Sequence, residues 1–298
     1  MTFKQWLKFI EIQSLVASAL PLILGNLYAV KTYHLIHPTY AIIFALVAFA
    51  LQMAVNVWNN LSDFQRATSD EWKNGVNNVI GEAGITPVQG WGTLFGLVAF
   101  VAIGGIWLVT VTGLPLLFMG IIGFVIAYWY AGTPVPLSRT PFGELASGLT
   151  MGYLIFLAAT YVNIAPTFNF TLLWHAIFAS AVAWFAIGNI MLANNLGDFE
   201  EDVAEGRHTL AFYLGKATTL RLFGWIYDAG YVMVIISVLL GILPWTALIA
   251  ILSYPIVHRN VRKFQANPAK NPNFILAIKN AVVISIFLAL GLGLGLIF

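Results

Sequence analysis

The hexapeptide NNLSDF occupies residues 59–64, and a near copy, NNLGDF, occupies residues 194–199. Each copy directly follows a long apolar stretch, which ends in VNVW before the first copy and in NIMLA before the second. A polar hexapeptide that recurs at matching points indicates that the two surrounding segments have related structures.

The composition of the chain is that of a membrane protein. Of its 298 residues, 60% are hydrophobic and only 9% are charged, whereas soluble domains carry roughly a quarter charged residues. A helix that crosses a bilayer needs about 20 apolar residues. We therefore expect an all-α integral membrane protein of nine transmembrane helices in one domain, 1–298, with spans at residues 12–30, 39–58, 91–112, 115–131, 143–163, 172–193, 218–240, 243–257 and 274–298.

The distribution of positive charge predicts the orientation of this bundle. If the N-terminus is cytoplasmic, all of the 14 Lys and Arg residues except Lys31 fall at or near the cytoplasmic side, as the positive-inside rule requires. The net charge of +2 is too small to indicate a nucleic-acid partner. The absence of cysteine excludes disulfides and thiolate metal sites. We expect a multi-pass protein of the plasma membrane with both hexapeptides on the cytoplasmic face.

The spacing of the two hexapeptides indicates an internal duplication. Four spans separate them, and an even number of crossings returns the chain to the same face. This pattern is typical of parallel repeats. The sequence predicts two four-helix repeats, residues 9–131 and 143–257, followed by an extra helix at 274–298.

Acidic residues gather in the two loops that the hexapeptides open. Nine of the 12 Asp and Glu residues lie there, and like charges repel one another unless a cation lies among them. A spacing of four residues puts Asn59 and Asp63 on one helical stripe, and Asn194, Asp198 and Asp202 on another. Oxygen ligands without His or Cys suit Mg²⁺ or Ca²⁺. The predicted metal ligands are Asp63, Asp70, Asp198 and Asp202.

A Mg²⁺ site of this kind predicts a diphosphate ligand, because Mg²⁺ is typically held by one or two carboxylates together with substrate phosphate oxygens. At the mouth of an apolar bundle, the natural ligand is a lipid diphosphate whose tail runs inward among the helices. The positive-inside rule alone would also place each of the nearby basic residues on this side of the membrane. The candidates to contact the diphosphate are Asn59, Arg66, Lys73, Arg139, Asn194 and Arg207.

Of the three acids outside these loops, two lie at or within the predicted spans of the second half. Asp228 falls within the seventh span, where an ionisable group is a functional candidate, and it would either orient an acceptor or pair with a neighbouring helix. Glu144 begins the fifth span and would either cap it or neutralise Arg139. A two-repeat cation transporter is the rival hypothesis, but transporter sites lie near the bilayer midplane. The acids of the hexapeptides lie at the ends of their spans, which favours an enzyme.

The two Asp motifs are similar to those of a known family. Asn-x3-Asp at 59–63, with Asp-x3-Asp at 198–202 and the following GRHTLAFYLG, resembles the UbiA superfamily of intramembrane aromatic prenyltransferases. Within it, FIEIQSLVASALPLILGNLYA, TPFGEL and ANNLGDFEEDVAEGRHTLAFYLGK resemble the bacterial 1,4-dihydroxy-2-naphthoate polyprenyltransferases of menaquinone biosynthesis. Asn60 is a departure, since the wider family commonly has Asp there.

The resemblance implies nine helices around a cavity, a Mg²⁺-bound polyprenyl diphosphate held by both motifs, and an aromatic acceptor. It gives catalytic roles to Asp63, Asp198 and Asp202, and it matches Arg139 to a basic residue near the diphosphate. Ionisation of the donor gives an allylic cation, which the acceptor ring attacks, and a naphthoate acceptor then loses carbon dioxide. Another ring, such as 4-hydroxybenzoate, would use the same chemistry. Prenyl chain length and oligomeric state are left open.

Overall fold

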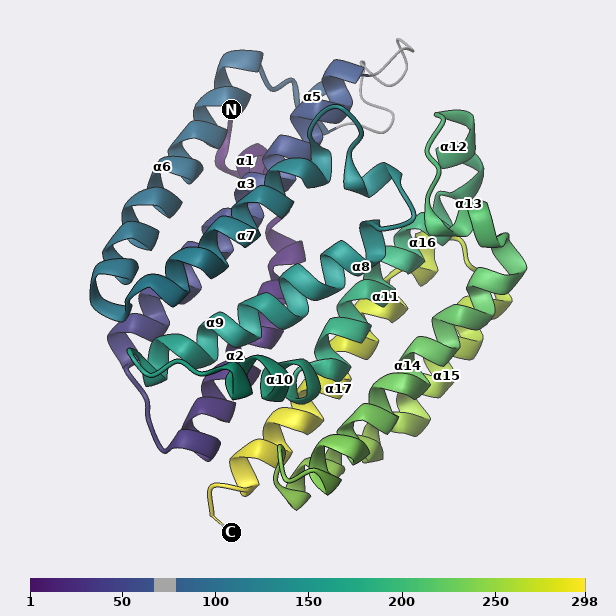
Figure 1. Cartoon of the computed structure of the whole chain (residues 1–298). Coiled ribbons are helices and arrows are strands. Elements are labelled where there is room, and N and C mark those ends of the chain that lie inside the picture. Colours follow the sequence, from purple (N-terminus) through teal and green to yellow (C-terminus); the bar gives the residue numbers. More distant parts are fainter. Residues whose placement is uncertain (67–78, 298) are drawn as a thin grey trace.

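The computed structural model describes residues 1–66 and 79–297, and this part of the chain folds into helices without a strand (Figure 1). The all-α prediction is therefore confirmed. Residues 67–78 and 298 lie outside the described residues, and two predicted site residues, Asp70 and Lys73, fall among them.

The elements alternate between long helices and short connecting turns. In the first half they are α1 (Phe3–Phe9), η1 (Ile12–Leu15), α2 (Val16–Tyr33), α3 (Pro38–Arg66), α5 (Val79–Ala83), α6 (Pro87–Thr112), α7 (Leu114–Ala131) and η2 (Leu137–Arg139). In the second half they are α8 (Gly143–Ser147), the π-helical η3 (Gly148–Leu154), α9 (Ile155–Ile164), α10 (Phe170–Ala179), α11 (Ala181–Gly197), α12 (Phe199–Ala204), α13 (Leu210–Leu214), α14 (Lys216–Leu239), η4 (Trp245–Ser253), α15 (Tyr254–Ala266), α16 (Lys270–Asn273) and α17 (Ile275–Leu294).

Most of the expected spans are present. Within the described residues, 7 helical segments are long and apolar enough to cross a bilayer, and α10 and α11, bent by 59° relative to each other, make an eighth if the pair is counted as one span. The eighth expected span, 243–257, is not confirmed. It folds as η4, 9 residues of 3₁₀-helix, and then continues into α15, 13 residues whose last turns carry basic side chains. The orientation in the membrane stays a prediction, and so does the division into repeats.

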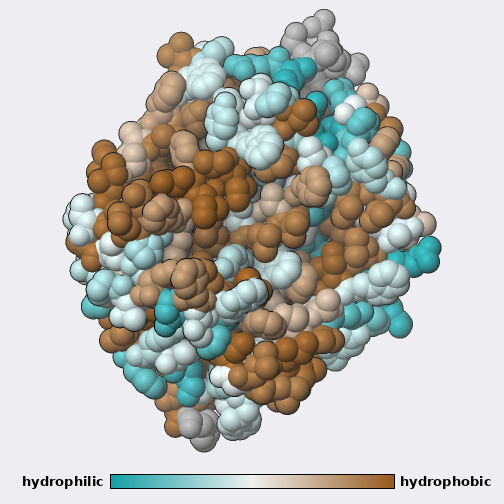
Figure 2. Space-filling view, in the orientation of Figure 1, coloured by the Kyte–Doolittle hydropathy of each residue, from teal (hydrophilic) through white to brown (hydrophobic). Residues whose placement is uncertain are grey.

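Large apolar side chains cover the outside of the bundle. Phe95 is 65% exposed, Ile103 72% and Phe118 61%. In Figure 2 such brown side chains cover much of the visible surface, while teal hydrophilic residues gather at the upper right, where Figure 1 shows α12. A surface of this kind is stable in contact with lipid, which agrees with a multi-span membrane protein.

Local sequence explains where the helices start and reverse. Thr86 caps α6, because its hydroxyl accepts a hydrogen bond from the Gln89 amide while the Gln89 side chain bonds back to Thr86. The chain turns sharply from α6 into α7 at Gly113, whose φ of 96° is accessible mainly to glycine. The boundary between the third and fourth expected spans therefore lies at this residue.

The arrangement of the helices brings the two hexapeptides to one end of the bundle. Each hexapeptide lies at the C-terminal end of a long helix, α3 for the first and α11 for the second. In Figure 1 the end of α11 lies beside α12 and α16, and the C-terminus lies at the opposite end of the bundle. Helix α2 packs against α9 and α17, and α11 packs against α14 and α17, which holds the two halves together.

A close crossing of η3 and α11 positions the second hexapeptide. A Cβ atom added at Gly152 would lie 2.3 Å from Trp184 Cα, and one added at Gly148 would lie 2.6 Å from the Trp184 carbonyl oxygen. Only glycine fits at these contacts, since small residues allow two membrane helices to approach closely. The π-helical turn η3 lies at this crossing and directly follows α8.

Candidate active site

The end of α3 presents the first pair of predicted site residues. The Asn59 amide donates a hydrogen bond to Asp63 Oδ2 at 3.4 Å, as the four-residue spacing predicts. Asp63 interacts electrostatically with Arg207, Arg139 and Arg66, so cations from three parts of the chain surround it. The first hexapeptide therefore lies close to the loop that follows the second.

Asp202 and Arg207 form the best-defined ion pair of this region. Arg207 Nη1 lies 3.0 Å from Asp202 Oδ1, and the Asp202 side chain is only 5% exposed. Gly206, with a φ of 67°, makes the turn that lets the Arg207 amide donate to the Asp202 carbonyl at 2.8 Å. Burial raises the pKa of Asp202 although Arg207 opposes this effect. Asp202 Oδ2 is buried, and none of the described residues donates a hydrogen bond to it.

Asp198 is paired with a residue that the sequence reading treated only as a loop cation. Lys270 Nζ, from α16, lies 2.5 Å from Asp198 Oδ2. The pairing depends on Gly197, because a Cβ there would lie only 3.0 Å from Lys270 Cβ. Asn194 lies one turn earlier, and its carbonyl accepts a hydrogen bond from the Asp198 amide at 3.0 Å. No sequence motif marks Lys270, so only the fold reveals this contact.

Arg139 joins the site through both its backbone and its side chain. Its carbonyl accepts a hydrogen bond from the His208 amide at 3.0 Å, which ties η2 to the loop that carries Arg207. Burial is the main cause that lowers the pKa of Arg139, and the charge of Arg207 adds to it. The Nε atoms of Arg139 and Arg207 are both buried, and no described residue accepts a hydrogen bond from them. Each guanidinium group thus keeps one donor that an anion could accept from.

Buried acids lie behind these charged groups, and sequence reasoning missed their partners. Glu144, in the first turn of α8, accepts a hydrogen bond from the Asn195 amide at 2.8 Å, and the sequence did not predict this partner. Glu144 Oε2 and Asn195 Oδ1 have no hydrogen-bond partner among the described residues. Glu11 accepts from Asn60 at 3.0 Å, and burial raises the pKa of Glu11. The position of Glu11 beside a hexapeptide Asn could not be read from its own neighbours in the sequence.

Asp228 is not brought into this cluster by any contact among the described residues. It lies on α14 and accepts a hydrogen bond from Tyr254 of α15 at 3.2 Å. Of the two roles considered for Asp228, these contacts match the pair between neighbouring helices.

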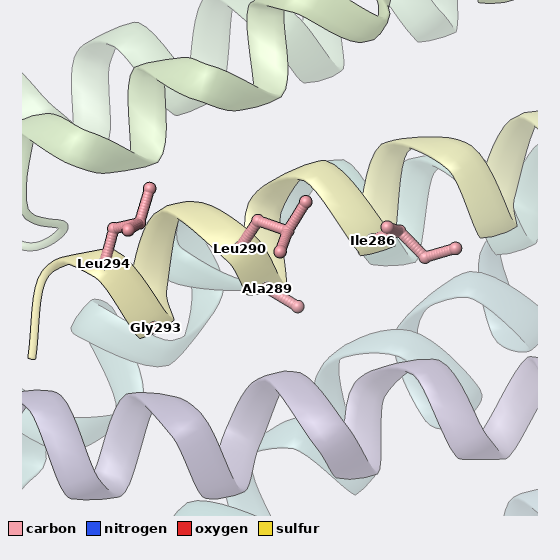
Figure 3. A pocket seen from close by; sticks show the side chains of 5 residues that line it. All are labelled: Ile286, Ala289, Leu290, Gly293 and Leu294. Carbon is pink, nitrogen blue, oxygen red and sulfur yellow. The ribbon is translucent and has the colours of Figure 1, made fainter.

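A groove on α17 has no polar lining. Its side chains are Ile286, Ala289, Leu290, Gly293 and Leu294, near the C-terminal end of the helix (Figure 3). This end of the bundle is opposite to the one that holds the hexapeptides (Figure 1). The groove is suited to lipid and cannot bind a charged group.

The residues fit a metal that is shared with a phosphate ligand. In the described part of the chain, no three Asp, Glu or His side chains gather closely enough to hold a metal by themselves, and Lys270 and Arg207 each pair with one Asp. Asp70 lies outside the described residues. Mg²⁺ needs only one or two carboxylates when phosphate oxygens complete its shell. The unpartnered Asp202 Oδ2 is an oxygen ligand of the required type.

Sequence comparisons show which known proteins this chain resembles. The sequence model of the UbiA prenyltransferase family matches residues 18–295. A Bacillus subtilis (strain 168) protein named 1,4-dihydroxy-2-naphthoate octaprenyltransferase is 29% identical over 288 residues, which cover 95% of this chain and 89% of the relative.

Solved structures share the fold. The apo structure of a UbiA homologue from Aeropyrum pernix K1 matches with a TM-score of 0.70 and 14% identity, covering 92% of this chain and 97% of the homologue. The structure of a UbiA homologue from Archaeoglobus fulgidus bound to GPP and Mg²⁺ matches with a TM-score of 0.67 and 13% identity, covering 97% and 98% of the two chains.

Proposed function

Because this chain belongs to the UbiA prenyltransferase family, we propose that it transfers a polyprenyl group from a polyprenyl diphosphate to 1,4-dihydroxy-2-naphthoate. The product would be the reduced, 1,4-dihydroxy form of demethylmenaquinone, an intermediate of menaquinone biosynthesis. The active-site loops would face the cytoplasm of a bacterial cell, because nearly all of the Lys and Arg residues lie on that side of the predicted topology.

The acceptor is proposed from one observation, the name of the Bacillus subtilis relative, which aligns along nearly the whole chain. It favours naphthoate over 4-hydroxybenzoate as the acceptor. The donor class is supported by the charged end of the bundle, where buried and unpartnered guanidinium atoms face buried carboxylates.

The chain's own cations would hold the diphosphate. Arg139 and Arg207 each have a buried Nε atom without a partner, and guanidinium groups bind phosphate oxygens in a fixed, forked geometry. Arg66 shares the electrostatic environment of Asp63 with them. The amides of Asn59 and Asn194 would add hydrogen bonds, and Lys73 is a further proposed contact outside the described residues.

The acids would hold Mg²⁺ against the diphosphate. Asp63, Asp198 and Asp202 are the proposed ligands, with Asp70 as a fourth outside the described residues. When bound, the metal supplies positive charge that stabilises the leaving diphosphate. Support comes from the Archaeoglobus fulgidus homologue, which is described as bound to GPP, a prenyl diphosphate, and Mg²⁺.

In the proposed reaction, the bond between the allylic carbon and the diphosphate oxygen breaks, and its electron pair leaves with the diphosphate. Arg139 and Arg207 neutralise the charge that develops there. The ring carbon that bears the carboxylate then attacks the allylic cation. The carbon–carboxylate bond breaks afterwards, which returns its electrons to the ring and releases carbon dioxide. Tyr130 interacts electrostatically with Glu144 and Asp63, and its ring is a candidate to stabilise the cation.

The acceptor assignment is tested with naphthoate that carries ¹⁴C in its carboxyl group. Purified protein in lipid nanodiscs receives this acceptor, a polyprenyl diphosphate and Mg²⁺, with 4-hydroxybenzoate as the comparison acceptor. We expect one labelled carbon dioxide to be released for each prenylated naphthol formed. A prenylated product from 4-hydroxybenzoate alone, or a naphthoate product that keeps its label, would contradict the assignment.

A further inference from the structure

A stripe of basic side chains lines a hollow on α15, separate from the candidate active site. Apart from Pro255 and Ala266, the lining residues are His258, Arg259, Arg262 and Lys263. Their spacing of one, three and four residues places them on one side of the helix. Arg259, Arg262 and Lys263 are exposed. The opposite side of α15 is buried through residues such as Val257 and Phe264.

Among the described residues, no ion pair involves the cations of this basic hollow. The ion pairs described elsewhere in the chain involve other cations, namely Arg207, Lys216 and Lys270. One acid, Asp228, lies beside the start of α15, where Tyr254 donates to it at 3.2 Å. One carboxylate cannot balance three permanent cations on neighbouring turns, and like charges at this spacing repel one another. An anion bound in the hollow would relieve that repulsion.

The surroundings of the basic hollow are those of a membrane surface. The preceding η4 exposes large apolar side chains, with Trp245 66% and Leu252 66% exposed. At the other end of α15, Gln265 donates to the Leu220 carbonyl at 2.8 Å, near the first turn of the apolar helix α14. The cations therefore follow an apolar stretch and lie where the bundle passes from lipid to water. An anion with an apolar tail fits both parts of this surface.

We infer that the basic hollow binds the headgroup phosphate of an anionic phospholipid of the surrounding bilayer. The positive-inside rule explains cations in loops, but it does not require four basic side chains to line one hollow of a helix where the described residues form no ion pair with them. Clusters of Lys and Arg on an amphipathic helix are typical binding sites for anionic headgroups. The inference is independent of the proposed acceptor and donor, since none of these residues lies in the candidate active site.

The test compares binding of phosphatidylglycerol and phosphatidylcholine by native mass spectrometry of the purified protein. The variant Arg259→Gln/Arg262→Gln is compared with Lys4→Gln/Lys8→Gln, which removes the same charge from α1. A surface cation contributes about fivefold in affinity for an anionic lipid, on the order of 1 kcal/mol. We expect the wild type to prefer phosphatidylglycerol, the α15 variant to lose about fivefold or more of that preference, and the α1 variant to keep it.

Three results would overturn the inference. Equal retention of both lipids by the wild type would show that the hollow does not select an anionic headgroup, and this measurement needs no variant. An equal loss in the α1 variant would assign the effect to overall charge. Displacement of phosphatidylglycerol by added inorganic phosphate would assign the hollow to a soluble anion. Circular dichroism of both variants checks that they keep the helical fold.

Discussion

Lys270 Nζ lies 2.5 Å from Asp198 Oδ2, which joins two residues 72 positions apart in the chain. The Lys270 side chain is 50% exposed and the Asp198 side chain 16%, so water partly screens the pair. Such pairs contribute little to stability and can exchange for another cation. A metal ion that uses Asp198 would therefore compete with Lys270.

We expect Lys270→Met to lower the Mg²⁺ concentration that half-saturates prenyl transfer by about two- to fivefold, since an exposed ion pair is worth about 0.2–1 kcal/mol. Titration of the transfer rate with Mg²⁺ measures this value. The matched control is Lys216→Met, because Lys216 pairs at 2.6 Å with Glu200, whose side chain is 74% exposed. A higher Mg²⁺ requirement in Lys270→Met, or the same shift in the control, would contradict the competition.

Replacing Asp202, the buried acid that pairs with Arg207, should have a larger effect on prenyl transfer than Lys270→Met. We expect Asp202→Asn to lower kcat by about 100-fold or more, because a preorganised charge that stabilises a transition state typically contributes this much. The measurement is the steady-state rate at saturating donor and acceptor. The control is Glu200→Gln. Glu200 lies two positions before Asp202 and is exposed, so this variant should keep nearly full activity. Comparable losses in both variants would point to a general effect of charge at this end of the bundle.

Much of this architecture could be predicted from the sequence. Long apolar runs define helices directly, and the even number of spans between the hexapeptides predicts that α3 and α11 end on the same side. The family's enzymatic activity also excludes the rival cation transporter. The segment 243–257 was harder to predict, because an apolar run gives no sign of the switch from 3₁₀-helix to the basic α15.

The partners of individual site residues could not be predicted. Asp198 meets Lys270 only because α16 packs against Gly197, and Asn195 meets Glu144 only because η3 crosses α11 at glycines. Such contacts depend on how helices rotate about their axes, and uniformly apolar spans carry no periodic signal for that rotation. For the same reason the sequence could not show that Asp228 bonds to Tyr254.

Glu11 should make the protein's stability depend on pH. Burial is the main cause that raises the pKa of Glu11 above its ordinary value of 4.5. An acid whose pKa is higher in the folded state than in the unfolded state stabilises the protein at pH values below its unfolded-state pKa. This stabilisation is lost as the pH rises through the folded-state pKa. We expect Glu11→Gln and wild type to melt alike below about pH 4.5 in detergent, and Glu11→Gln to melt higher at alkaline pH.

The control variant, Glu200→Gln, should change the melting temperature in the opposite direction. The hydrogen bond from Lys216 is the main cause that lowers the pKa of Glu200, so its stabilising effect is present above pH 4.5 and is lost as the pH falls. Glu200→Gln should therefore melt slightly lower than wild type at neutral pH. If the melting difference between Glu11→Gln and wild type did not change with pH, Glu11 would not titrate differently in the folded state.

The glycine crossing predicts a position where one methyl group destabilises the bundle. We expect Gly152→Ala to cost about 1–3 kcal/mol, as overpacking typically does, because the new Cβ would lie 2.3 Å from Trp184 Cα. Gly120→Ala is the control, since a Cβ there meets no atom within 4 Å. Thermal melting in one detergent compares the two variants. Equal stability of both would show that η3 and α11 separate without cost.

The central claim is that the ends of α3 and α11 form one site for a Mg²⁺-bound polyprenyl diphosphate. Equilibrium binding of radiolabelled polyprenyl diphosphate in the presence of Mg²⁺ tests it most directly, with wild type, Asp63→Asn, Asp198→Asn and the double variant. Residues that share one ligand are coupled, so their effects do not add. We expect each single variant to lose about tenfold or more in affinity, on the order of 1.4 kcal/mol, and the double variant to lose little beyond that. Wild-type affinity in either single variant, or fully additive losses in the double variant, would contradict a shared site.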